Sequence, residues 1–299
     1  MIISKVLGGM GNQMFQYAVG RAISLDYGVP LLLDISGFAS YRLHLGFELH
    51  RVFNCPAEIA NEANLRSLLG WQSSSLMRRV VSRSSMTAFR KKNFVIEPHY
   101  HFWDGIKNIP RDSYLVGYWL SVKYFKDRAS EVRRDFAFKT PLSEKNAEIA
   151  AQISQVNAVG LHVRRGDYAK DPKTAATQGL CSLDYYRAAI YYVSERVEKP
   201  HFYVFSDDID WVKTNLKLDF PCRFIGHNQG VESYNDMRLM SLCKHNIIAN
   251  STFSWWGAWL NDYTNKIVVT PQAWLANTDI VSDYKKFMDD LVPSDWVRL

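Results

Sequence analysis

The residues best suited to chemistry lie near the middle of the chain, where Arg164 and Arg165 follow a short apolar run and precede Gly166 and Asp167. Arginine keeps its charge at any physiological pH, and its planar fork of donors fits two phosphate oxygens at once. At a strand end such a pair could hold a diphosphate, with Gly166 allowing a tight exit from the strand. A surface Arg–Asp pair fits the same pattern, so the motif alone leaves both readings open.

A second polar group, Ser206-Asp207-Asp208, directly follows the strand predicted over 201–205. An acid at a strand end can bind a ribose hydroxyl, a guanine N–H edge or a divalent metal. It can equally cap the helix that follows. Because the acids coincide with a helix start, the pattern predicts no metal site.

A third group, at 250–254, joins a strand end to small hydroxyl residues at a helix start, a combination that favours anions. Its members are Asn250, Ser251, Thr252, Phe253 and Ser254. Asp236 lies near the start of an amphipathic helix predicted over 233–243, and the pattern alone favours a solvated position for it. The tryptophans after 254 are more typical of a core than of a binding surface.

Near the N-terminus, a glycine loop at 8–11 follows the first predicted strand. Met14 stands where the dinucleotide fingerprint needs a third glycine, and no phosphate-loop lysine follows, so neither motif is present. Asn12 and Gln13 supply donors and acceptors suited to hydroxyl groups. A tight strand–helix turn without a ligand explains the loop as well. The aromatic and histidine cluster at 99–103 is compatible with a carbohydrate site or with a half-buried strand.

The elements around these groups predict an α/β fold. The first thirty-four residues are typical of a strand–helix–strand unit, and short strands alternate with helices again after residue 158. Ligands of parallel sheets bind outside the carboxyl ends of the strands, which is where the polar groups fall. Residues 140–144 carry a helix-start signature and are expected at a domain boundary.

Composition narrows the class of protein. A hydrophobic fraction of 47% suits a packed core, and a net charge of +6 favours an anionic partner. The four cysteines are far apart, which supports neither a disulfide framework nor a zinc site. No apolar run is long enough to cross a membrane, so we expect a soluble cytoplasmic protein. The basic, partly apolar stretch at 76–94 is compatible with a solvated helix or with peripheral contact to anionic lipid on the inner face of a membrane.

The chain resembles the bacterial α-1,2-fucosyltransferases of glycosyltransferase family 11 over nearly its whole length. The resemblance rests on five motifs in the same order, at 8–17, 117–125, 162–168, 205–208 and 247–256. It implies a GT-B-type fold in which two Rossmann-like domains face a cleft. The expected domains are an acceptor-side α/β domain at 1–145 and a GDP-fucose-binding domain at 146–299.

The resemblance also implies an activity. We expect inverting transfer of L-fucose from GDP-β-L-fucose to the 2-hydroxyl of a terminal galactose in an oligosaccharide, as in O-antigen synthesis. No cofactor, no metal and no nucleic-acid partner are expected. An α-1,6- or protein O-fucosyltransferase is the alternative within this class. A non-catalytic nucleotide- or RNA-binding module is the alternative outside it.

Roles follow from the charges that develop during transfer. Arg164 is expected to stabilise the leaving diphosphate, and His162 to orient an arginine or touch the diphosphate. The similarity to related fucosyltransferases implies that Asp236 would accept hydrogen bonds from guanine. The full set expected to bind the donor is Arg165, Asp167, Ser206, Asp207, Asp208, Asp236, Asn250, Ser251, Thr252, Phe253 and Ser254. The residues expected on the acceptor side are Asn12, Gln13 and Trp119. Among Asp34, His44, Glu48, His99 and His101, nothing in the spacing selects a general base.

Overall fold

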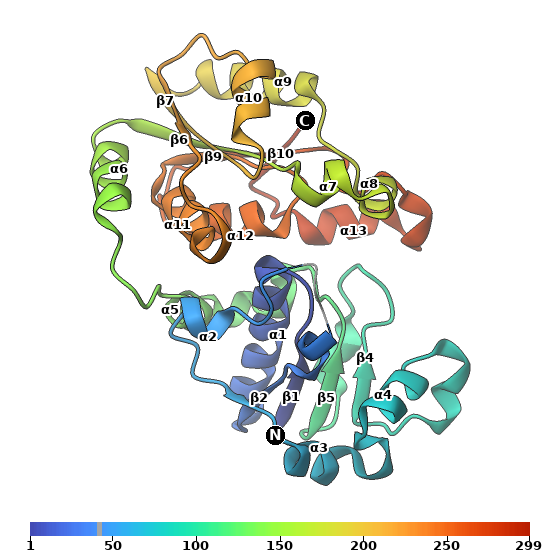
Figure 1. Ribbon diagram of the computed structural model, residues 1–299. Helices are drawn as coiled ribbons and strands as arrows, with labels where there is room; N and C mark the ends of the chain where they lie inside the picture. The colour runs from blue at the N-terminus through green and yellow to red at the C-terminus, as the bar shows by residue number, and fades with distance from the viewer. Residues whose placement is uncertain (41–43) are drawn as a thin grey trace. The chain divides into compact units, whose positions relative to one another are not determined.

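The computed structural model describes residues 1–40 and 44–299, which form two compact α/β units (Figure 1). The first unit comprises 1–139 and 281–291, and the second comprises 140–280 and 292–299. The second unit therefore starts within the segment that carries the helix-start signature. The division differs from the expected one at two segments, because 140–145 belongs to the second unit and 281–291 belongs to the first.

The first unit is built on a five-stranded parallel sheet with the strand order β3-β2-β1-β5-β4. Its strands are β1 (Ile2–Lys5), β2 (Leu31–Asp34), β3 (Glu58–Ile59), β4 (Phe94–Ile96) and β5 (Ser113–Val116). Ile3, Leu32, Phe94 and Tyr114 lie in one buried cluster with side chains of α3 (Glu62–Leu69) and α4 (Ser75–Val81). The predicted strand–helix–strand unit at the N-terminus is confirmed.

The first unit also contains helices. They are α1 (Met10–Tyr27), α2 (Leu49–Val52), α3 (Glu62–Leu69), α4 (Ser75–Val81), α5 (Ala129–Asp135) and α13 (Tyr284–Leu291). Short segments of 3₁₀-helix are η1 (Ser36–Ser40), η2 (Gly70–Ser73), η3 (Ser84–Phe89), η4 (Asp104–Asn108), η5 (Val122–Tyr124) and η6 (Lys126–Arg128). The sequence pattern over 122–136 predicts a single helix. That prediction is wrong, because Phe125 adopts φ −138° and ψ 10° and separates η5 from η6.

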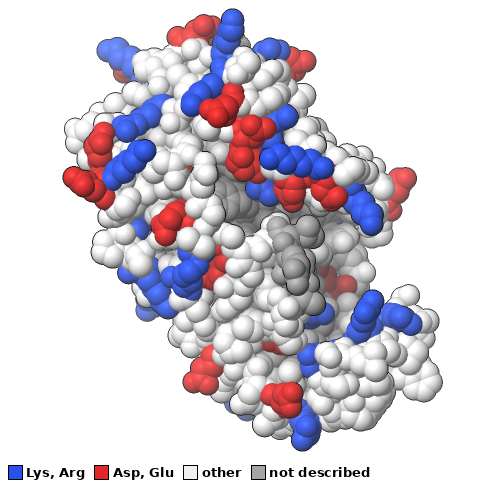
Figure 2. Space-filling view, viewed as in Figure 1, with Lys and Arg blue, Asp and Glu red and all other residues white. Residues whose placement is uncertain are grey.

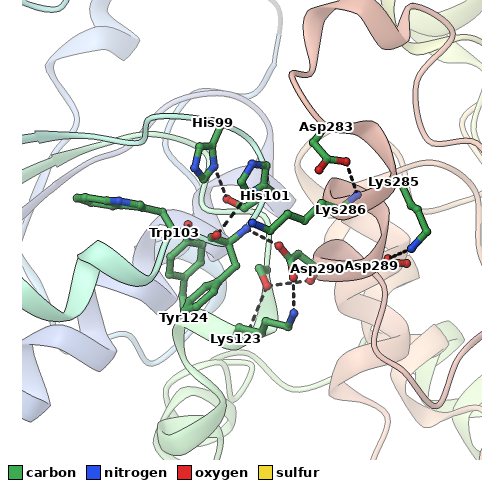
Figure 3. Close-up of polar contacts among 12 residues, drawn as sticks. His99, His101, Trp103, Lys123, Tyr124, Asp283, Lys285, Lys286, Asp289 and Asp290 are labelled. Carbon is green, nitrogen blue, oxygen red and sulfur yellow. Dashed lines mark hydrogen bonds and ion pairs between the residues drawn. The ribbon is translucent and has the colours of Figure 1, made fainter.

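Asp290 explains why α13 belongs to the first unit (Figure 3). Its buried carboxylate accepts the backbone N–H of Phe102 at 2.6 Å and forms an ion pair with Lys123. Its carbonyl oxygen accepts the Ser121 hydroxyl at 2.8 Å. Beside these contacts the rings of His99 and His101 are stacked. Burying a carboxylate is costly unless it is paired and hydrogen-bonded, and Asp290 is both.

The second unit contains a six-stranded parallel sheet with the order β11-β10-β9-β6-β7-β8. Its strands are β6 (Asn157–Val163), β7 (Pro200–Ser206), β8 (Cys222–Ile225), β9 (His245–Ile247), β10 (Val268–Thr270) and β11 (Val297–Arg298). From β6 the chain proceeds outward through β7 and β8, then returns to β9 on the other side of β6. The strand order therefore reverses between β6 and β9, the place where such sheets bind ligands.

The helices of this unit are α6 (Glu144–Ser154), α7 (Gly166–Lys170), α8 (Pro172–Gln178), α9 (Leu183–Ser194), α10 (Ile209–Asn215), α11 (Tyr234–Leu242) and α12 (Thr252–Leu260), with 3₁₀ turns η7 (Gly230–Glu232) and η8 (Thr278–Ile280). Ser143 and Ser182 cap α6 and α9 by accepting backbone N–H groups. Trp255 and Trp256 on α12 are fully buried, so the prediction that they belong to the core is confirmed.

All four cysteines are free, as their spacing predicted. Within 1–40 and 44–299, no helix combines the length and the apolar character needed to cross a lipid bilayer.

Candidate active site

Polar residues follow β6, β7, β8 and β9 at the carboxyl edge of the sheet in the second unit (Figure 1). Between them lies a pocket of about 370 Å³, within the usual range for small-molecule sites. It is lined by His162, Arg164, Ser206, Asp207, Ile209, Gly226, Asn228, Gln229, Gly230, Ser233, Asp236 and Phe253. Six of these are residues that the sequence analysis assigned to donor binding or catalysis.

Arg164 carries the positive charge of the pocket. Its Nη1 atom lies 2.8 Å from Asp207 Oδ2, and its Nη2 atom lies 2.5 Å from Asp167 Oδ1. Burial alone would lower the pKa of the guanidinium, but the two carboxylates outweigh burial and raise it. The buried Nε–H has no hydrogen-bond partner among the described residues. Arg164 is thus a charged group that two carboxylates hold in place and whose Nε–H makes no bond to the described residues.

Asp207 holds this arrangement together. While one of its oxygens pairs with Arg164, the other accepts the backbone N–H of Arg165 at 2.8 Å. Gly166 is what allows the approach, since a Cβ atom there would lie 2.3 Å from Asp207 Oδ2. The glycine in the motif is therefore required for close packing between the loops that follow β6 and β7.

Arg165 makes a different set of contacts. Its guanidinium stacks on the Trp211 ring at 3.5 Å from the ring centroid, and its Nε lies 3.2 Å from Asp208 Oδ2. Asp208 in turn donates its backbone N–H to Ser206 Oγ at 3.0 Å. Neither Arg165 nor Asp208 lines the pocket. The two adjacent arginines thus have separate environments. Arg164 lines the pocket, and Arg165 packs against Trp211 of α10.

His162 lies at the end of β6 and is almost completely buried. Burial, and to a smaller extent the charge of Arg164, lower the pKa of its imidazole to about 3. The ring is therefore neutral at physiological pH. Its Nδ1 atom has no hydrogen-bond partner in the described part of the chain, and its ring lies 5.6 Å from that of Phe253, centroid to centroid. A neutral imidazole in this position can make one hydrogen bond to a bound molecule.

Asp236 supplies a buried carboxylate to the pocket. Its Oδ1 accepts from Asn228 Nδ2 at 2.8 Å, and Asn228 is held by Asn146 through bonds of 2.9 and 3.2 Å. His227 Nε2 lies 2.9 Å from Asn146 Oδ1 and completes the chain of side chains. Burial raises the pKa of Asp236 to about 7 despite the bond from Asn228. The solvated position that the helix pattern favoured is wrong, because Asp236 is buried.

The segment at 250–254 contributes chiefly through Phe253, which lines the pocket. Asn250 is buried, and its amide group donates to the carbonyl oxygens of Gln178, Gly179 and Trp274. The Ser254 hydroxyl donates to the carbonyl of Ser251 at 3.2 Å. Ser251 is buried ahead of α12, and Thr252, the first residue of that helix, is half-buried. In this structure, Asn250 and Ser254 bond to backbone carbonyls of the second unit.

The three residues expected on the acceptor side lie in the first unit. Gln13 is buried, donates to the carbonyls of Gly8 and Gly46, and accepts the backbone N–H of Glu48. Asn12 is half-buried in the first turn of α1. Trp119 is fully buried with φ +58°. The contacts of Gln13 and Trp119 are those of groups that shape the loops around them.

Sequence reasoning missed Glu97, Asn146 and Asn228. Glu97 follows β4 and accepts the backbone N–H groups of Tyr118 and Trp119, at 2.7 and 3.0 Å. Burial raises its pKa to about 7, although the two N–H groups act in the opposite direction. Glu97 and Asn228 each follow a short strand, so their position at a strand end was the available signal. Asn146 lies on a helix and carried none.

Comparison with known proteins identifies the family of this chain. The family description "Glycosyl transferase family 11" matches residues 59–297. The chain belongs to glycosyltransferase family 11. It is 33% identical to an α-1,2-colitosyltransferase of Escherichia coli, covering 100% of this chain and 99% of that protein. It is 32% identical to the E. coli O-antigen biosynthesis glycosyltransferase WbnK, covering 91% and 94%. A galactoside 2-α-L-fucosyltransferase of Bos taurus, SEC1, is 26% identical, covering 85% and 62%.

The fold agrees with this assignment. The chain of the fucosyltransferase NodZ from Bradyrhizobium superposes with a TM-score of 0.52 at 13% identity, covering 86% of this chain and 91% of that one. The expected GT-B-type fold, with two Rossmann-like α/β domains, is confirmed. The protein is therefore a glycosyltransferase of this fold. Within the described residues, no cluster of three or more His, Cys, Asp or Glu side chains is arranged to hold a metal ion.

Proposed function

We propose that this glycosyltransferase moves L-fucose from GDP-β-L-fucose to the 2-hydroxyl of a terminal galactose, with inversion at the anomeric carbon and in O-antigen synthesis. The sequence similarity to a galactoside 2-α-L-fucosyltransferase and to an O-antigen glycosyltransferase supports the sugar and the setting. The charges of the pocket support the nucleotide.

The observation that carries the proposal is that one pocket is lined by both Arg164 and Asp236. Arg164 is a fixed cation with an available Nε–H, which suits a diphosphate. Asp236 is a buried carboxylate, which suits a nucleobase that presents adjacent N–H donors. Guanine presents two such donors, N1–H and N2–H₂, whereas adenine has an acceptor at N1. A pocket with this distribution of charge favours GDP over ADP.

In this proposal Arg164 performs the main chemical task. As the bond from the anomeric carbon to the phosphate oxygen breaks, negative charge grows on the departing GDP, and a preorganised cation stabilises it without reorganisation. The neutral imidazole of His162 adds one hydrogen bond beside it. Because a guanidinium meets the leaving group, the transfer needs no metal. Asp207, Asp167 and Gly166 serve to hold Arg164 in place.

A second donor has a specific observation in its favour. The E. coli relative that matches the whole chain is a colitosyltransferase. Colitose is L-fucose without the 3-hydroxyl, so the two GDP-sugars share the nucleotide, the diphosphate and most of the ring. The pocket residues described above meet the parts that the two donors have in common. The choice between them lies in contacts to a single hydroxyl.

A donor panel tests the proposal. Purified protein is offered GDP-fucose, GDP-colitose and ADP-activated sugars with a β-galactoside acceptor, with and without a chelator. We expect turnover with GDP-fucose that the chelator does not reduce. Preferred turnover of GDP-colitose would replace the proposed donor, and chelator-sensitive turnover would overturn the metal-free mechanism. Calorimetry with GDP, ADP and a short RNA addresses the binding-module alternative, which predicts binding of RNA without transfer.

A further inference from the structure

The net charge of this protein is concentrated in one small part of the first unit. Residues 70–92 contain six Arg and Lys and no Asp or Glu. The whole chain has 36 basic and 30 acidic residues, so the remainder balances at 30 of each. We call 70–92, which comprises η2, α4, η3 and the three basic residues that follow, the basic lobe.

Two of the six cations have structural contacts: Arg78 joins the lobe to residues after β2, and Arg90 bonds within the lobe. Arg78 is buried, donates to Ser36 Oγ at 2.9 Å and lies 3.6 Å from Asp34 Oδ2. Arg90 donates to the backbone carbonyls of Val81 and Arg83. The other four, Arg79, Arg83, Lys91 and Lys92, are exposed. The lobe thus combines an ordered frame with four cations that face water.

Large apolar side chains share this surface. Trp71, Leu76 and Phe89 are 56%, 69% and 64% exposed. Trp71 is the single exposed tryptophan of nine, all of which lie in the described residues. Gln72 joins two of the segments involved, because its amide donates to the carbonyl of Phe89 at 2.7 Å and its oxygen accepts the backbone N–H of Lys91 at 3.4 Å. Figure 2 shows blue side chains beside a wide uncharged surface on this lobe.

We propose that the basic lobe is a docking surface for an anionic lipid bilayer. Lysine and arginine beside exposed Trp, Leu and Phe are what an interfacial membrane contact requires, since the cations meet lipid phosphates while the apolar side chains enter the headgroup region. The absence of any acid in 70–92 removes the repulsion that an anionic surface would otherwise meet. Leu76 favours a bilayer over RNA, because an aliphatic side chain gains from burial in lipid and offers no ring for base stacking.

Co-sedimentation of the full-length protein with vesicles tests this proposal. One set of vesicles is phosphatidylcholine, and the other is phosphatidylcholine mixed with phosphatidylglycerol. We expect binding to the mixed vesicles that weakens as salt is added. Removing Lys91 and Lys92 together, as Lys91→Ala/Lys92→Ala, should weaken it by roughly 25-fold, about fivefold for each cation. The matched control Lys213→Ala/Lys217→Ala removes two exposed lysines of the second unit and should leave binding unchanged.

The contribution of the exposed apolar side chains can be measured separately. The fluorescence of Trp71 should shift to the blue on mixed vesicles, and Trp71→Phe should abolish that shift. Trp71→Ala should reduce vesicle binding, while Tyr191→Ala, which removes an exposed aromatic from α9, should not. Equal binding to both vesicle types, equal loss in the lysine control pair, or binding to a short RNA with none to either vesicle would overturn the proposal. Vesicle binding requires no donor or acceptor, so its outcome is independent of the proposed transfer reaction.

Discussion

Asp207 and Arg164 form a 2.8 Å ion pair between the loops that follow two neighbouring strands, β6 and β7. The pair fixes the guanidinium at the carboxyl edge of the sheet while leaving its buried Nε–H without a partner among the described residues. The second Asp207 oxygen accepts the backbone N–H of Arg165, so a single carboxylate orients both arginine positions. Several consequences of this arrangement can be measured.

Arg164→Ala should lower kcat by about 10²–10³-fold, because it removes a preorganised donor to the leaving diphosphate. Circular dichroism should show an intact fold. Arg187→Ala is the matched control, since it removes an arginine from the exposed face of α9, where it pairs with Asp184 at the surface. A kcat within tenfold of the unmodified protein would remove Arg164 from the proposed role.

Arg165→Ala should act on stability more than on rate. The stacking on Trp211 and the pair with Asp208 are lost, which should reduce the free energy of unfolding by about 1–2 kcal/mol. Denaturant titration measures this, and kcat should change by less than about tenfold, since Arg165 does not line the pocket. A loss of kcat as large as that of Arg164→Ala would instead indicate direct contact with the donor.

Gly166→Ala should disturb the pocket through sterics alone. The added Cβ would lie 2.3 Å from Asp207 Oδ2, so the carboxylate must move away from Arg164. We expect a loss of about 1–3 kcal/mol of stability together with reduced kcat. Gly37→Ala, where a Cβ meets nothing within 4 Å, is the control. The two changes Gly166→Ala and Asp207→Ala should be less than additive in stability, because removing the carboxylate relieves the clash. Full additivity would contradict the proposed clash.

Asp236 should make GDP affinity depend on pH. Its pKa of about 7 means that the carboxylate protonates as pH falls through neutrality, and the protonated form no longer accepts both guanine donors. Affinity should therefore rise from pH 6 to pH 8 and level off above it. The pKa of His162, about 3, keeps that ring neutral throughout the range.

Asp236→Asn is the matched test, because it preserves the shape of the side chain and the titration of the GDP phosphates. Calorimetry should find weaker binding in this variant and a shallower pH dependence. An identical pH profile in both proteins would assign the titration to the ligand. The same pKa has a consequence for stability. The folded protein retains a proton that the unfolded chain releases above its ordinary pKa, so this group lowers the free energy of unfolding as pH rises from about 4 to 7.

Much of the fold follows from local patterns. The strand predicted over 201–205 lies within β7, and the helix-start signature at 140–144 contains Ser143, the cap of α6, because capping depends on a few neighbouring residues. α13 was not predicted, nor was its membership of the first unit, because that depends on Asp290 meeting Phe102 and Lys123 far away in the sequence. The very short strands β3 and β11 likewise had no distinct pattern.

The candidate site likewise combines features that local sequence predicts with features that depend on contacts distant in the sequence. The motif at 162–167 predicted that charged groups gather at a strand end, and the pocket contains His162 and Arg164. The sequence could not separate the roles of the two arginines, because that depends on Trp211 and Asp208 lying beside only one of them. It could not identify Asn228 and Asn146 either, since their hydrogen bonds to each other span 82 residues.

The most direct test of the proposed reaction is the linkage of its product. The protein is incubated with GDP-fucose and a β-galactoside, with Arg164→Ala as the inactive control, and the purified product is examined by NMR. The proposal predicts an α-configured fucose on the galactose 2-hydroxyl. Fucose on any other hydroxyl, a β-linked product, or no fucosylated product would contradict it.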